Sequence, residues 1–155
     1  MRRKRAKTRD ILPDPRFGDE LVAKFVNGLM QDGKKSLAYT IFYSAIDGVK
    51  EKTNEDGLIV WKKALDNIMP SVEVKRRRVG GSTFQVPREI RPERRLSLGI
   101  KWLVSYARSR GEKTMKERLI HEIIAASNEE GNAFKRKVDT HRMASSNKAF
   151  SHFNF

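Results

Sequence analysis

The sequence contains no cysteine, which excludes disulfide bonds, thiolate chemistry and a cysteine-ligated zinc site. Histidine is also scarce. The three histidines are His121, His141 and His152, and none lies in a His-Glu-x-x-His pattern. The glycine-rich motifs that bind nucleotide phosphates, GxxxxGK[ST] and GxGxxG, are missing as well. We therefore expect no enzymatic activity, no cofactor and no metal site.

Long apolar runs are also missing. None approaches the roughly 18 residues that a membrane-spanning helix needs. The basic N-terminus is not followed by the apolar segment of a signal peptide. We expect no membrane association and a cytoplasmic location, where a reducing environment fits the lack of cysteine. The 155 residues are the length of about one domain.

Acidic residues are few relative to basic ones. There are 19 Asp and Glu against 33 Lys and Arg, which gives a formal net charge of +14 and a sequence pI near 10.3. A charge of this sign and size is typical of proteins that bind nucleic acid. The hydrophobic fraction of 38% still allows a modest core.

Residues 72–88 predict a β-hairpin around Gly80 and Gly81, because two adjacent glycines can both adopt the positive φ of a type I′ turn. With this turn, Arg78 faces Thr83, Arg77 faces Phe84, Lys75 faces Val86, and Glu73 forms an opposite-charge pair with Arg88. The four consecutive cations are Lys75, Arg76, Arg77 and Arg78. A two-stranded ribbon is marginal alone in water, so we expect a polyanion to order this one. The alternative is a solvated edge hairpin whose charges prevent aggregation.

Apolar residues recur at helical spacing in six other stretches, three before the hairpin and three after it. Asp19 is the expected N-cap of the first helix, Pro92 a first-turn residue of the fourth, Thr114 the start of a capping box for the fifth, and Asn132 the expected N-cap of the sixth. We predict a mostly α fold, a single domain of about six helices with a protruding β-ribbon between the third and fourth. Residues 1–18 are expected to form a basic, extended tail, and 19–155 the helical domain.

Seven stretches form a joint pattern: DILPDPRFG at 10–18, DGKKS at 32–36, VEVK at 72–75, RRVGGST at 77–83, QVP at 85–87, HRMA at 141–144 and NKAF at 147–150. Together they resemble the bacterial family of small-subunit ribosomal protein seven (uS7). The resemblance implies a helical domain with a protruding ribbon. It also implies direct binding to the 3′ major domain of small-subunit rRNA, nucleation of head assembly, and a place at the subunit interface near exit-site tRNA and outgoing mRNA. Small-subunit proteins nine and eleven are the neighbours that it implies.

On this basis we predict RNA contacts from three regions, since proteins read A-form RNA mostly through its backbone and irregular junctions. The tail would thread between RNA helices, the globular face would clamp phosphates, and the ribbon would lie against RNA. The residues are Arg2, Arg3, Lys4, Arg5 and Lys7 of the tail, Lys34, Lys35, Arg94, Arg95 and Arg142 of the helical domain, and Lys75, Arg76, Arg77 and Arg78 of the ribbon.

Two alternatives remain open. A helical body with a basic β-ribbon arm also suits an architectural DNA-binding protein, although Val79 at the tip would be a poor wedge between base pairs. A nuclease acting through Asp139 and His141 is the third possibility. It has little support, because residues two apart do not share one face of a helix.

Overall fold

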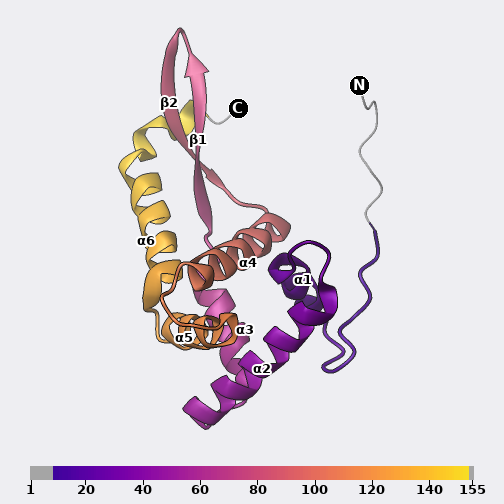
Figure 1. The fold of residues 1–155 in the computed structure, drawn as a ribbon. Coiled ribbons are helices and arrows are strands. Elements are labelled where there is room, and N and C mark those ends of the chain that lie inside the picture. The colour runs from indigo at the N-terminus through magenta and orange to yellow at the C-terminus, as the bar shows by residue number, and fades with distance from the viewer. Residues whose placement is uncertain (1–8, 154–155) are drawn as a thin grey trace. The chain divides into compact units, whose positions relative to one another are not determined.

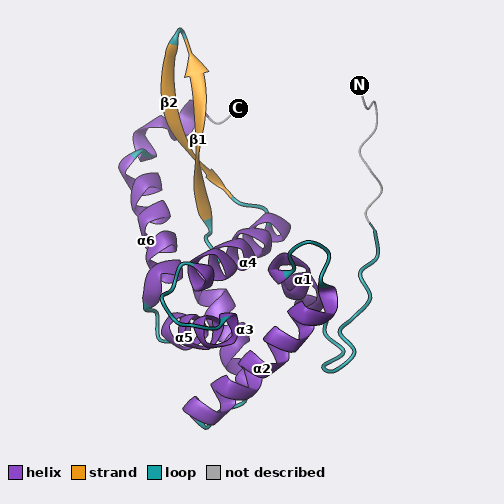
Figure 2. Cartoon of the chain, in the orientation of Figure 1, coloured by secondary structure: helices purple, strands orange, loops and turns teal. Residues whose placement is uncertain are grey.

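The computed structural model describes residues 9–153 and divides the chain into two compact units, with the boundary after Thr40. Figure 1 traces the chain from its N-terminus to its C-terminus, and Figure 2 separates helices, strands and loops. Six α-helices and one antiparallel hairpin make up this described part, apart from a short 3₁₀ helix near its end. The predicted fold class is confirmed, with the hairpin between the third and fourth helices.

The first unit contains α1 (Glu20–Leu29) and the first residues of α2 (Lys35–Thr53). Asp19 caps α1 as predicted, because its side chain accepts a hydrogen bond from the Leu21 amide at 2.8 Å. The apolar stripe of α1 is buried, including Phe25 and Val26. Asp32 and Gly33 lie between the helices with φ of 52° and 74°, so the helical path stops there.

The second unit contains the rest of α2, then α3 (Gly57–Ile68), β1 (Val72–Val79), β2 (Ser82–Glu89), α4 (Pro92–Arg108), α5 (Met115–Ser127), α6 (Gly131–Ser146) and the 3₁₀ helix η1 (Lys148–Phe153). Helices α3, α4 and α5 pack together around a core that includes Trp61, Leu103 and Ile123. The Trp61 ring meets Phe42 edge-on, with the centroids 5.2 Å apart.

The hairpin extends beyond α3, α4 and α5 and runs beside α6 (Figure 1). Its inner end belongs to the core, since Val86 and Ile90 are 2% and 7% exposed. The η1 segment, which was not predicted, lies against β2, and Phe150 meets Phe84 at a ring-centroid distance of 5.2 Å. The C-terminal segment therefore supports the hairpin along one strand.

The predicted capping box of α5 is confirmed, but the predicted cap of α6 is wrong. Thr114 and Glu117 exchange the two reciprocal hydrogen bonds of a capping box. Helix α6 begins at Gly131 with Glu130 as its N-cap residue, not at Asn132. The reason is tertiary: Glu122 of α5 accepts a hydrogen bond from the Ala133 amide at 3.0 Å, so one free N–H of the first turn is satisfied from another helix.

No helix in residues 9–153 combines the length and the apolar character that crossing a bilayer requires.

Candidate nucleic-acid interface

The hairpin has the register that the sequence predicted. Arg78 pairs with Thr83, Arg77 with Phe84, Lys75 with Val86 and Glu73 with Arg88. The turn has φ of 57° at Gly80 and 91° at Gly81, which is the positive-φ pair that a type I′ turn requires. Each strand is eight residues long, so the ribbon reaches about 25 Å.

The cations of β1 differ in their surroundings. Lys75, Arg76 and Arg78 are exposed, whereas Arg77 is partly buried on the face that carries Phe84. The 3₁₀ helix η1 packs against Phe84 on that face. The hairpin therefore carries its row of cations on a supported strand and not on a free loop. Arg76 and Arg78 alternate onto one face of β1, where an extended polyanion can contact both at once, whereas Lys75 lies on the other face.

Glu73 at the base of the hairpin forms its ion pair with Arg94 of α4, not with the cross-strand Arg88. The Arg94 guanidinium donates two hydrogen bonds from Nε, at 3.1 and 3.0 Å, and one from Nη2 at 2.8 Å. This carboxylate raises the pKa of Arg94, by hydrogen bonding first and by charge second. The side chain is still 55% exposed, so its remaining N–H groups can reach a phosphate.

The entry to β1 is held by side chains from two helices. Arg95 Nε donates to the Pro70 carbonyl at 3.2 Å, and His141 Nε2 accepts from the Ser71 amide at 3.1 Å. Burial lowers the pKa of His141, and the charges of Lys137 and Arg95 lower it further. A neutral imidazole can accept this bond, so α4 and α6 fix the direction in which the hairpin leaves the helices.

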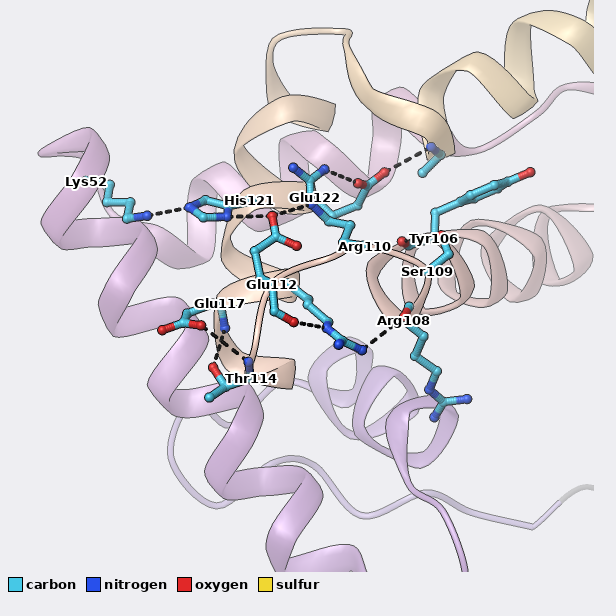
Figure 3. A network of polar contacts seen from close by, with 12 residues as sticks. Lys52, Tyr106, Arg108, Ser109, Arg110, Glu112, Thr114, Glu117, His121 and Glu122 are labelled. Atoms are coloured by element: carbon cyan, nitrogen blue, oxygen red, sulfur yellow. Dashed lines mark hydrogen bonds and ion pairs between the residues drawn. The ribbon is translucent and has the colours of Figure 1, made fainter.

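A second polar network fixes the start of α6 (Figure 3). Arg110 bridges Glu112 at 2.9 Å and the fully buried Glu122 at 2.7 Å, and Glu122 also accepts the Ala133 amide of α6. His121 extends the network from Glu112 to Lys52 of α2. Arg110 lowers the pKa of Glu112 to about 2, with help from hydrogen bonds to the backbone and to His121. The lowered pKa keeps Glu112 charged at neutral pH, and the hydrogen bond from the Ala133 amide to Glu122 ties the first turn of α6 to α5.

The predicted cations fall into three groups. Arg2, Arg3, Lys4, Arg5 and Lys7 lie outside the described residues. Lys34 and Lys35 are exposed and belong to the first unit, where Lys35 Nζ lies 5.8 Å from the Tyr39 ring centroid. The second unit contains the others: Lys75, Arg76, Arg77 and Arg78 of the hairpin, Arg94 and Arg95 at its base, and the exposed Arg142 of α6.

A family model described as ribosomal protein S7p/S5e matches residues 1–148. The chain belongs to this family. Relatives called "Small ribosomal subunit protein uS7" are 66% identical over 153 residues in Amoebophilus asiaticus and 63% identical over 155 residues in Cytophaga hutchinsonii, with at least 99% of both chains covered. A relative with the same description in Acetivibrio thermocellus is 58% identical over 147 residues, which is 95% of this chain and 94% of that one.

The predicted resemblance to the S7 family is therefore confirmed, and the chain is a ribosomal protein of the small subunit and not an enzyme. This membership argues against the nuclease and architectural DNA-binding alternatives. Within residues 9–153, no group of three His, Asp or Glu side chains is placed to hold a metal ion.

The basic residues of α6 differ in their surroundings. Lys137 turns inward, where Nζ donates to the Asn67 carbonyl at 2.7 Å and burial lowers the pKa of the amine. Arg136 lines a groove against the hairpin together with Thr140 and Met143. Their spacing of four and then three residues was the available signal, since such residues share one helical face.

Proposed function

We propose that this S7-family protein binds the 3′ major domain of small-subunit rRNA directly and nucleates assembly of the subunit head. The observation that carries the proposal is the hairpin. Lys75, Arg76 and Arg78 are exposed on it, α6 and η1 pack against its strands, and α4 side chains hold its base. A braced cationic ribbon loses little conformational freedom on binding, so more of the phosphate attraction remains as affinity.

The rest of the binding surface follows from charge. Lys34, Lys35, Arg94, Arg95 and Arg142 would contact phosphates from the helices, and residues 1–18 would form a basic tail between RNA helices, distinct from the helical domain 19–155. RNA in A-form presents its backbone and its irregular junctions to a protein and hides base edges in a deep major groove. With about eight phosphate contacts, affinity should fall about a thousandfold or more between low and moderate salt.

We further propose a location at the subunit interface, near exit-site tRNA and outgoing mRNA, with small-subunit proteins nine and eleven as neighbours. Family membership supports this location. A hairpin that extends from the helical core also suits it, because such an element can reach RNA beyond the site that anchors the helices.

The test is binding of the purified chain to an rRNA junction fragment of the 3′ major domain at two salt concentrations. Duplex DNA and an unrelated RNA of equal length serve as competitors. Binding to the junction that survives both competitors is expected. Equal affinity for all three nucleic acids, collapsing with salt, would mean that net charge alone explains the binding and would refute the proposal.

A matched pair of variants then locates the contacts. Replacing Arg76 and Arg78 by Gln should reduce the slope of log affinity against log salt by about 2, because two phosphate contacts are lost. The control replaces Lys50 and Lys63, two exposed lysines of α2 and α3, by Gln, with the same change in net charge. Equal losses in both variants would contradict a hairpin-specific interface.

A further inference from the structure

A groove of about 330 Å³ lies between the hairpin, α4 and α6, all within the second unit. Figure 1 shows how these three elements are arranged: the hairpin extends beside α6, with α4 at its base. The groove combines apolar and cationic side chains that are far apart in the sequence. Leu98 and Trp102 come from α4, Arg136 and Met143 from α6, and Arg76 from β1.

Trp102 is the largest apolar side chain of the groove, and its environment differs from that of the other tryptophan. Trp61 is fully buried in the core. Trp102 is only partly buried, and its indole N–H forms no hydrogen bond to any residue in 9–153. Met143, which lines the groove from α6, is 40% exposed. An aromatic ring and a thioether facing the same open space form a surface on which a flat apolar group can stack.

The charges of the groove are unbalanced. The guanidinium groups of Arg76 and Arg136 form no ion pair within the described part of the chain. The one carboxylate at the groove, Glu73, is already neutralised by Arg94. The groove therefore offers two available cations, which suit an occupant that carries negative charge beside a flat ring.

We propose that this groove holds an unpaired RNA nucleotide whose base stacks on Trp102 and whose flanking phosphates contact Arg76 and Arg136. Single-stranded RNA is commonly recognised in this way, by aromatic stacking of a base beside a cationic path for the backbone. The side-chain amide of Gln85, on the hairpin wall, can hydrogen-bond to a base edge. This inference rests on the proposed rRNA binding and adds to it the recognition of an unpaired base.

An RNA occupant fits better than a peptide because the groove adjoins the cationic row of the hairpin. Arg76 belongs to both surfaces, so one RNA strand can contact the row and enter the groove without a break. An acidic peptide would satisfy the two arginines but would leave the exposed Lys75 and Arg78 without an anion.

The test uses the intrinsic fluorescence of the full chain during titration with the junction RNA fragment and with a fully paired RNA duplex of the same length. The chain has two tryptophans, and only Trp102 can reach RNA, since Trp61 is 0% exposed. The junction fragment should quench the signal at saturation, whereas the duplex should not. The variant Trp102→Phe keeps an aromatic ring, so it should retain affinity within about threefold and lose the quenching, because only Trp61 remains.

Two further variants test the contribution to affinity. Trp102→Leu should weaken junction binding about tenfold or more, since stacking of a base on an aromatic side chain is lost. Arg136→Gln should weaken it about tenfold, whereas the neighbouring and exposed Lys135→Gln, which makes the same charge change outside the groove, should cost no more than about threefold. All variants must have circular dichroism spectra and unfolding midpoints close to those of the wild type. If Trp102→Leu fails to fold, the RNA affinity of Arg136→Gln tests the groove instead.

The outcomes distinguish a failure of the groove proposal from a failure of the proposed rRNA binding. If wild-type protein prefers the junction but shows no quenching, or if both Trp102→Leu and Arg136→Gln bind within twofold of wild type, the groove proposal is overturned and the proposed rRNA binding stands. If these variants bind RNA normally but lose association with a neighbouring ribosomal protein, the groove is a protein site and the proposal is also overturned. Wild-type protein without preference for the junction over duplexes would refute the proposed function itself.

Discussion

Among the charged side chains of the second unit, Arg110 is the one whose removal should lower the free energy of unfolding most. Its guanidinium joins Glu112 of the α4–α5 loop to Glu122 of α5, and Glu122 in turn holds the first turn of α6. Replacing Arg110 by Met keeps a long apolar stem and removes the charge. Glu122, which is 0% exposed, would then be a buried carboxylate without its cation (Figure 3).

The expected cost is about 3 kcal/mol in free energy of unfolding. Breaking a buried ion pair by removing one partner costs about 3–5 kcal/mol, and the lower end applies because the Arg110 side chain is 27% exposed. Glu122→Gln should cost less, about 1–2 kcal/mol, since an amide oxygen can still accept the Ala133 amide. The double variant should cost less than the sum of the two single variants, by about 1–2 kcal/mol.

Urea unfolding followed by circular dichroism measures these differences from the transition midpoints at constant slope. A loss of 3 kcal/mol should also lower Tm by about 6–12 °C for a chain of this length. If Arg110→Met cost less than about 1 kcal/mol, or if the two single costs were simply additive, Arg110 and Glu122 would behave as a solvated surface pair. This network would then not anchor α6.

Three further predictions concern the elements around the interface. Thr114→Ala should destabilise the protein by about 1 kcal/mol because the capping box of α5 is lost, and an unchanged urea midpoint would contradict this. Gly81→Val should raise hydrogen exchange of the hairpin amides about tenfold or more, since φ is 91° there, whereas Ser82→Val next to it should not. Protonation of His141 is disfavoured in the folded state, so folding stability should fall as pH drops below about 6.5. Urea midpoints at pH 7 and pH 5 should therefore differ less in His141→Asn than in the wild type. An equal difference in both proteins would show that His141 does not cause the pH dependence.

The hairpin register could be predicted because its determinants are local. A two-residue glycine turn fixes which residues of the two strands face each other, and pairing from Glu73 to Arg88 follows by counting. The N-cap of α1 and the capping box of α5 are equally local, since each depends on residues within three positions. The α6 cap could not be found in this way, because Glu122 reaches Ala133 from a different helix.

For the candidate interface too, some features depend on the local sequence and others on tertiary contacts. The sequence alone determined the helical class, the place of the ribbon, the excess of positive charge and the resemblance to the S7 family. The tertiary structure decided which cations have partners: Arg94 is paired with Glu73, Lys137 is turned inward, and Arg136 faces a groove beside Trp102. The physical reason is that the availability of a charge depends on the side chains that folding brings next to it, and these come from elements more than 20 residues away in the chain.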